Sequence, residues 1–436
     1  MKLLFQLYIA FLLPQLVIAQ FWETKNAGFA NDSMAVWNIC IVDENTVWAS
    51  GFNIYEGSQT YSHQFTKSTN GGESFEPNEF SGLPDSLHIS YLHAATADSA
   101  WLAMWGDSIA GSSIFFTSNG GASWHAQSTA DFSGANAFAN IVYFFDSKNG
   151  VCMGDPNNGY FEHYTTTDGG QNWVRVNSVD LPVPLSGEAG YNRGKSFDVV
   201  DGIIYYGTNK GRILKSSDMG YTWTAYDTDL DIITKIAFKD SLTGIIVGEG
   251  IQSLITFTGG ISWYYMAFNT EYYGGQIEYA HGNDGFWATI WQGAGISGSA
   301  YSLNNGSSWT RMDSVFYTDI QFVNTDIGWA GGISGISGNG GMFKWIGVVE
   351  NDVTINKIQS ANIFPNPCTT NICISNAVNC QLKIYSNLGN IVFSERILED
   401  FQNFELNSLE AGLYFVEIVN LRQKIITKHK LLKMDY

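Results

Sequence analysis

The octapeptide STNGGESF at Ser68–Phe75, together with five copies of its pattern, decides the fold. The copies are TSNGGASW (117–124), TTDGGQNW (166–173), SSDMGYTW (216–223), TFTGGISW (256–263) and SLNNGSSW (302–309). In each copy an initial Ser or Thr and, in most, an Asp or Asn two positions later can bond the amides of a turn. Glycine supplies positive φ, and the final aromatic residue packs inward as the next strand begins. The copies lie 40 to 50 residues apart and therefore predict six equivalent hairpin turns.

A second recurring element, rich in small and apolar residues, occurs seven times. Its copies begin at Thr46, Ala100, Gly150, Gly202, Gly244, Phe286 and Gly328. Most copies follow a further apolar run, so one unit holds four antiparallel strands in 40 to 50 residues. Such a unit is one blade of a β-propeller. We therefore expect an all-β chain in which residues 20–345 form a seven-bladed β-propeller.

The seventh unit predicts how the ring closes. It runs from Asp319 to Trp345 and has no octapeptide after it, so its outer strand is missing. The sequence FWET at Phe21–Thr24 can supply this strand from the other end of the domain. Closure by both ends of the domain would leave no open sheet edge.

The octapeptides resemble the Asp-box, or BNR, repeat of sialidase-like and photosystem-assembly-factor-like propellers, over residues 21–345. In that family the boxes are structural turns that lie far from any active site, and the resemblance implies the same role here. The corresponding residues are Asn70, Asn119, Asp168, Asp218 and Asn304, and the aromatic residues Trp124, Trp173, Trp223, Trp263 and Trp309. Asn replaces Asp in three of the copies, and Thr258 replaces it in the fifth.

Composition and charge exclude several classes of partner. Only 14% of the residues are charged and the net charge is −19, which argues against nucleic acid and anionic lipid surfaces as partners. No Cys or His spacing matches a zinc site, so we expect no metal and no cofactor. Five cysteines are too few for a disulfide framework, although Cys368, Cys373 and Cys380 could form one bridge.

The N-terminus predicts export. Residues 1–19 combine a basic start, an apolar stretch and the sequence Val17-Ile18-Ala19 before Gln20, which is typical of a cleaved signal peptide. A transmembrane anchor would need about 20 apolar residues. Polar residues and a proline interrupt this stretch, and no later stretch is long enough to span a membrane.

Residues 346–361 predict a linker, and residues 362–436 a small antiparallel, immunoglobulin-like β-sandwich. The Pro365-Asn366-Pro367 opening, the turn at Gly389, the strand at Gly412–Tyr414 and the basic end resemble the type A C-terminal sorting domain of type IX secretion substrates. An ordinary immunoglobulin-like module would have the same fold. The resemblance implies that the type IX secretion machinery is a partner, and that the protein is secreted or attached to the outer cell surface.

Blade geometry predicts that the functional face lies opposite the octapeptide turns, where the long loops gather. The richest group of side chains belongs to the third and fourth blades. Its members are Asp155, Tyr160, Glu162, Glu188, Tyr191, Arg193, Lys210 and Arg212. Carboxylates, tyrosines and arginines brought together by neighbouring loops could bind sugar hydroxyls or an acidic ligand. The alternative is that these residues only solvate and hold the loops.

Two functions compete. A propeller-type glycoside hydrolase could use Glu162 and Glu188 as acid and base. The sialidase pattern needs three arginines around its substrate, but only Arg193 and Arg212 fall on the candidate face, and no Phe-Arg-Ile-Pro motif is present. We therefore favour a non-catalytic module, with no catalytic residues, that binds a glycan or a surface protein.

Overall fold

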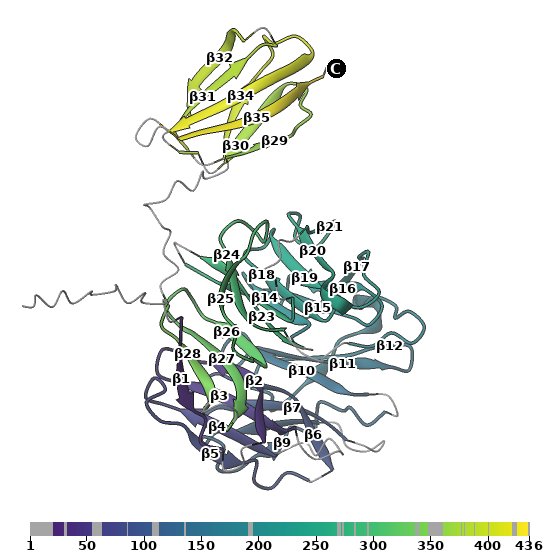
Figure 1. Cartoon of the computed structure of the whole chain (residues 1–436). Helices are drawn as coiled ribbons and strands as arrows, with labels where there is room; N and C mark the ends of the chain where they lie inside the picture. Colours follow the sequence, from purple (N-terminus) through teal and green to yellow (C-terminus); the bar gives the residue numbers. More distant parts are fainter. Residues whose placement is uncertain are drawn as a thin grey trace, which may run out of the picture. The chain divides into compact units, whose positions relative to one another are not determined.

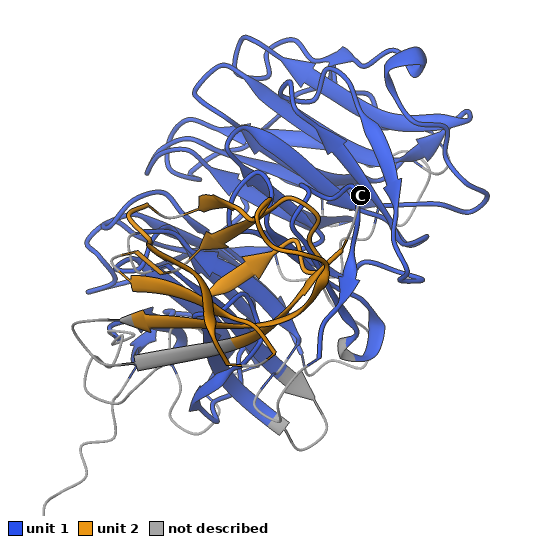
Figure 2. Cartoon of the chain, turned by 90° about the horizontal axis from the view of Figure 1, so that it is seen from above, with its two compact units in different colours: residues 1–349 blue, residues 350–436 orange. Residues whose placement is uncertain are grey.

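The structure of the protein is a computed structural model that describes residues 21–29, 33–54, 63–84, 86–106, 113–134, 137–190, 195–267, 272, 274–282, 285–293, 296–335, 340–347, 361–375, 377–378, 380–387, 389–399, 401–420 and 425–434. The chain divides into two compact units, residues 1–349 and 350–436, which Figure 2 colours separately and which are described one at a time. The division falls within the predicted linker, residues 346–361. Most of that linker and the predicted signal peptide lie outside the described residues.

Five separate four-stranded antiparallel sheets follow one another along the first unit (Figure 1). Within each sheet the spatial order of the strands is their order in the sequence. The strands are β6 (Leu87–Ala94), β7 (Ala100–Gly106), β8 (Ser113–Thr117) and β9 (His125–Ala126); β10 (Ala139–Phe144), β11 (Gly150–Asn157), β12 (Tyr160–Thr166) and β13 (Val174–Arg175); β14 (Phe197–Val200), β15 (Ile203–Gly207), β16 (Arg212–Ser216) and β17 (Thr224–Asp227); β18 (Lys235–Phe238), β19 (Gly244–Val247), β20 (Ser253–Thr256) and β21 (Tyr264–Tyr265); β22 (Gln276–Ala280), β23 (Phe286–Gly293), β24 (Ile296–Ser302) and β25 (Thr310–Asp313).

The other eight described strands of this unit form one sheet with two halves. They are β1 (Trp22–Asn26), β2 (Met34–Ile41), β3 (Val47–Asn53), β4 (Gln64–Ser68), β5 (Glu76–Glu79), β26 (Asp319–Phe322), β27 (Gly328–Ser334) and β28 (Gly340–Trp345). One half is β2–β5, the other is β26, β27, β28 and β1, and the single pair Ala35 and Ile333 joins them. Strand β1, purple in Figure 1, lies beside β28, green, and runs antiparallel to it. In this pairing Trp22 lies opposite Trp345. The predicted pairing of the two ends of the domain is confirmed.

The first strands of neighbouring sheets contact one another. Strand β6 contacts β2 and β10, β18 contacts β14 and β22, and β26 contacts β22 and β2. Side chains of these strands bond the backbone of the next sheet: Ile39 N–H donates to Asp319 Oδ2 (2.7 Å), and Leu92 N–H donates to Asn38 Oδ1 (2.7 Å). The unit is therefore a β-propeller, and its blade number of seven stays a prediction.

The octapeptides form the turns between the third and fourth strands, and one bonding pattern recurs in them. In the first copy, Gly72 N–H donates to Ser68 Oγ (2.9 Å) and Ser74 N–H donates to Asn70 Oδ1 (3.0 Å). Asn serves as well as Asp because a single side-chain oxygen accepts these bonds. In the fifth copy Thr258 Oγ1 takes the same role and accepts from Ser262 N–H (2.9 Å).

The hydrophobic cores lie between neighbouring sheets. One core contains Trp101 of β7 together with Phe144, Tyr164 and Trp173 of the next sheet. The ring centroids of Trp101 and Phe144 are 3.8 Å apart. The final aromatic residues of the octapeptides Phe75, Trp124, Trp173, Trp223 and Trp309 are buried, and Trp263 is half-buried. This packing explains why the last position of the octapeptide is aromatic.

The second unit is a small β-sandwich. One sheet holds β29 (Asn362–Phe364), β30 (Asn371–Ser375) and β33 (Gln402–Glu405), and the other holds β31 (Cys380–Tyr385), β32 (Ile391–Arg396), β34 (Gly412–Asn420) and β35 (Ile425–Lys433). Ile372, Ile374, Leu382, Ile384 and Phe404 are among the residues of the core between them. The fold class is therefore all-β as expected, with two 3-10 turns, η1 (Ser178–Asp180) and η2 (Glu249–Ile251), among the described residues.

The described residues contain neither a membrane-spanning helix nor a disulfide. Within the described part of the chain, no helix has the length and apolar character needed to cross a bilayer. All five cysteines are described, and none is in a disulfide, so the bridge considered among Cys368, Cys373 and Cys380 is not formed.

Candidate ligand site

Hydrogen bonds between turns identify the two faces of the propeller. Gly71 N–H of the first octapeptide donates to the Asn45 carbonyl (2.9 Å), which belongs to the turn between the first two strands of the same blade. The fifth octapeptide repeats the bond, from Gly259 N–H to the Leu242 carbonyl (2.8 Å). Both kinds of short turn therefore share one face, and the loops after the second and fourth strands lie on the opposite face.

Two of the predicted site residues, Glu188 and Arg212, bind each other. Only 5% of Glu188 and 8% of Arg212 is exposed. Two guanidinium nitrogens of Arg212, Nε and Nη2, donate to the Glu188 carboxylate, and Nε lies 2.9 Å from Oε1. The carboxylate also accepts from Leu185 N–H and from the Thr208 hydroxyl, each at 2.8 Å. The buried charge of Glu188 is thus paired and hydrogen-bonded, and it holds the loop that contains Leu185 and Glu188. This supports the alternative that Glu188 and Arg212 only hold the loop.

Glu162 and Tyr160 both contact Arg175, which lies on the outer strand β13. Arg175 of β13 lies 2.6 Å from Glu162 Oε1, and its guanidinium carbon lies 4.0 Å from the centre of the Tyr160 ring. Glu162 also accepts from Asn157 Nδ2 (2.9 Å) and from the Tyr164 hydroxyl (3.0 Å). The pairing of Glu162 with Arg175 had no signal in the sequence, because the two residues are 13 positions apart on different strands.

Asp155 and Lys210, the other described residues of the predicted group, do not join these two pairs. Asp155 accepts from Asn140 Nδ2 (2.6 Å) and Gly190 N–H (2.9 Å), and burial raises the pKa of Asp155 to about 7 against these hydrogen bonds. Lys210 is exposed. Tyr191 and Arg193 lie outside the described residues. The described members of the predicted cluster are thus divided among separate groups.

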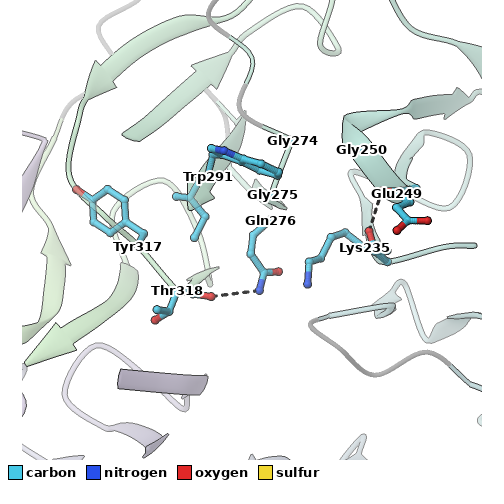
Figure 3. A pocket seen from close by; sticks show the side chains of 12 residues that line it. Lys235, Glu249, Gly250, Gly274, Gly275, Gln276, Trp291, Tyr317 and Thr318 are labelled. Atoms are coloured by element: carbon cyan, nitrogen blue, oxygen red, sulfur yellow. Dashed lines mark hydrogen bonds between the residues drawn. The ribbon is translucent and has the colours of Figure 1, made fainter. Parts of the chain in front are cut away.

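A cavity of about 260 Å³ lies on the same face, in the fifth, sixth and seventh blades (Figure 3). Inner strands β18 and β22 contribute Lys235 and Gln276, η2 contributes Glu249, β23 contributes Trp291, and Thr318 directly precedes β26. Gly248, Gly250, Gly274, Gly275, Ile290, Tyr317 and Thr234 complete the lining. We call this site the inner-strand cavity.

The backbone around the cavity is tightly fitted. Gly275 N–H donates to the Ile290 carbonyl (2.9 Å), and a Cβ on Gly275 would lie 2.6 Å from that carbonyl oxygen and 2.9 Å from the Trp291 ring. Any larger residue would push the loop away from β23. Trp291 is half-buried and packs against the core cluster that contains Ile277 and Trp287. The aromatic wall of the cavity is therefore fixed by the core behind it.

Two buried polar atoms in the lining have no hydrogen-bond partner among the described residues. They are Gln276 Oε1 and Thr318 Oγ1. Their residues are only 8% and 7% exposed, and buried polar groups in native proteins are nearly always bonded. In Figure 3 the Gln276 amide nitrogen points to the Thr318 carbonyl, 3.5 Å away, and the Lys235 side chain extends toward the same amide. The two unsatisfied oxygens are candidate contacts for a ligand.

Charged side chains gather on or next to the inner strands. Burial lowers the pKa of Lys235 to about 8, although the Asp319 carboxylate opposes this shift. Lys195 Nζ lies 2.7 Å from Glu278 Oε2, and burial raises the pKa of Glu278 to about 7. Burial likewise raises the pKa of Asp198, in spite of the charge of Lys195. Buried charges of this kind are common at functional sites.

The inner-strand cavity lies on the face that the sequence analysis assigned to function, but in other blades than the predicted residues. Its lining residues Gly274 and Gly275 directly precede β22, and Trp291 lies near the end of β23. One residue of this cavity that the sequence analysis did not single out is Lys235. It is the one charged residue in the apolar run Ile232–Phe238, and a lysine in a buried strand needs a reason.

Fold and tail define the class of protein as an exported β-propeller. Residues 362–432 match the family described as the secretion system C-terminal sorting domain. Such a type IX domain implies export to the cell surface or secretion. Among curated proteins, none matches this chain.

Solved structures resemble the first unit in fold. A structure described as YCF48 bound to D1 peptide has a TM-score of 0.51 and 12% identity, over 75% of this chain and 97% of its own. YCF48 from Cyanidioschyzon merolae has a TM-score of 0.53 and 17% identity, over 74% of this chain and 98% of its own. U3-55K has a TM-score of 0.51 and 8% identity, over 75% and 99%. At these identities the similarity shows the propeller fold alone.

Proposed function

We propose that the protein is a non-catalytic, glycan-binding β-propeller that type IX secretion delivers to the cell surface or the medium, and that the inner-strand cavity is its ligand site. The observation that carries this proposal is the pair of unsatisfied buried oxygens, Gln276 Oε1 and Thr318 Oγ1, in a cavity with an aromatic wall. A few placed polar groups beside an apolar surface are typical of small-ligand sites.

The geometry of Glu162 and Glu188 does not favour the hydrolase. A glycosidase acid needs a carboxyl group whose pKa is raised. Burial acts to raise the pKa of Glu188, but hydrogen bonds from Arg212, Leu185 and Thr208 outweigh burial and hold it below its ordinary value. Glu162 is 1% exposed and bonded to Arg175. Both carboxylates are occupied by the protein itself.

A glycan array with the mature chain tests the proposal, beside activity assays on chromogenic glycosides. We expect array signals that disappear in Trp291→Ala and no glycoside cleavage. The matched control is Tyr264→Ala, because Tyr264 is an exposed aromatic residue on the outer strand β21 and should leave binding unchanged. Equal binding by both variants would reject the cavity as the site, and turnover of a glycoside would reject the non-catalytic role.

A further inference from the structure

We propose that the inner-strand cavity recognises a hexuronate, a six-carbon sugar acid presented by an acidic glycan, and that the ammonium group of Lys235 pairs with its carboxylate. This inference rests on the proposed glycan-binding function and adds the chemical class of the ligand. Three features of the cavity carry it: its size and aromatic wall, its unsatisfied oxygens, and its buried cation.

Size and shape favour one sugar ring. The volume of about 260 Å³ is that of a site for a single small unit rather than for an extended chain. Trp291 is held by the core on one side and lines the cavity with the other. A flat indole surface suits the apolar face of a pyranose, which can stack on it while its hydroxyls point to polar groups.

The unsatisfied oxygens favour a ligand with several hydroxyl groups. Gln276 Oε1 can only accept a hydrogen bond, so its partner must be a donor. Thr318 Oγ1 can donate or accept. A sugar carries hydroxyls that donate and accept in several directions. A peptide offers one backbone N–H donor per residue, whereas a sugar ring presents several hydroxyl donors within one small unit.

The ammonium group of Lys235 favours an acidic sugar over a neutral one. Lys235 is 7% exposed and lies at the start of inner strand β18, where its charge feels the Asp319 carboxylate and the repulsion of Lys195. A ligand carboxylate would add a charge-assisted hydrogen bond in a setting with little water. The one acidic residue of the lining, Glu249, is exposed, so solvent and salt screen its repulsion.

Titration of the mature chain with monosaccharides tests the assignment. The probes are glucuronate and galacturonate, their neutral parents glucose and galactose, and glucosamine as a cationic control. We expect at least one uronate to bind about tenfold tighter than its neutral parent, and Lys235→Met to remove that preference. Thr318→Val keeps the charge and loses one hydroxyl partner, so it should weaken acidic and neutral sugars by the same factor.

The outcomes separate this inference from the proposed function. If neutral hexoses bind as tightly as uronates, and Trp291→Ala abolishes both, the carboxylate assignment is wrong while glycan binding stands. If none of the sugars binds and a peptide binds instead, both are wrong. Tryptophan fluorescence reports whether Lys235→Met folds, and if it does not, the wild-type preference for the acid over its neutral parent decides the question.

Discussion

Replacing Arg212 with Met should destabilise the propeller by about 3 kcal/mol without an effect on ligand binding. In the folded protein Glu188 accepts four hydrogen bonds, two of them from Arg212. The variant keeps the bonds from Leu185 and Thr208 but leaves the carboxylate buried without a counter-charge.

The magnitude follows from burial. Removing one partner of a buried ion pair costs about 3–5 kcal/mol. We expect the lower end because two neighbours in the loop, Val183 and Leu185, are 78% and 48% exposed, so water can reach the site. Lys25→Met is the matched control, since its partner Glu23 has a side chain that is 45% exposed, and losing a surface ion pair should cost only about 1 kcal/mol or less.

Chemical denaturation followed by tryptophan fluorescence measures these differences. All fourteen tryptophans lie in the first unit, so the signal reports the propeller alone. The double variant with Glu188→Gln and Arg212→Met should recover part of the loss, because no uncompensated charge remains. If Arg212→Met changes stability by less than about 0.5 kcal/mol and weakens ligand binding instead, the pair is a binding site and our account of it is wrong.

Three further predictions concern the scaffold, its pH response and export. Trp173→Ala should cost about 3–5 kcal/mol by denaturation because the ring is 5% exposed, whereas Val174→Ala, at a 65% exposed site, should change stability by less than about 0.5 kcal/mol. Burial lowers the pKa of His163 from 6.5 to about 3, so protonation favours the unfolded state and the free energy of unfolding falls as the pH drops below 6.5. From pH 7 to pH 5 the wild type should therefore lose about 2 kcal/mol more stability than His163→Phe. An equal loss in the two proteins would show that His163 is not the cause. Deleting residues 350–436 should leave the protein inside the cell by immunoblot of cells and medium, and unchanged release would show that the tail is not needed for export.

The fold could be predicted because its signals are local and repeated. Each octapeptide holds its own turn through bonds within five residues, such as Ser68 to Gly72, so the pattern is visible in the sequence. The closing strand was also predictable. The seventh unit lacked an outer strand, and the segment Phe21–Thr24 had no assigned partner, so pairing the two was the simplest prediction. In the structure β1 pairs with β28.

The site was harder because it depends on contacts between distant blades. Arg212 is attractive as a ligand residue until Glu188, 24 residues away, is seen to neutralise it. The inner-strand cavity joins Lys235, Gln276 and Thr318, each about 40 residues from the next, and no local pattern links them. A sequence shows which loops share a face but not which side chains already satisfy one another.

The most direct test compares two chemically identical changes on the glycan array, Lys235→Met in the inner-strand cavity and Lys210→Met in the loop group predicted from the sequence. Lys210 is exposed, so its loss should not affect folding, and it serves as the control for removing one positive charge. The account predicts that Lys235→Met loses the preference for acidic over neutral glycans and that Lys210→Met retains the wild-type profile. Loss of binding in Lys210→Met with retention in Lys235→Met would contradict the account and return the site to the third and fourth blades.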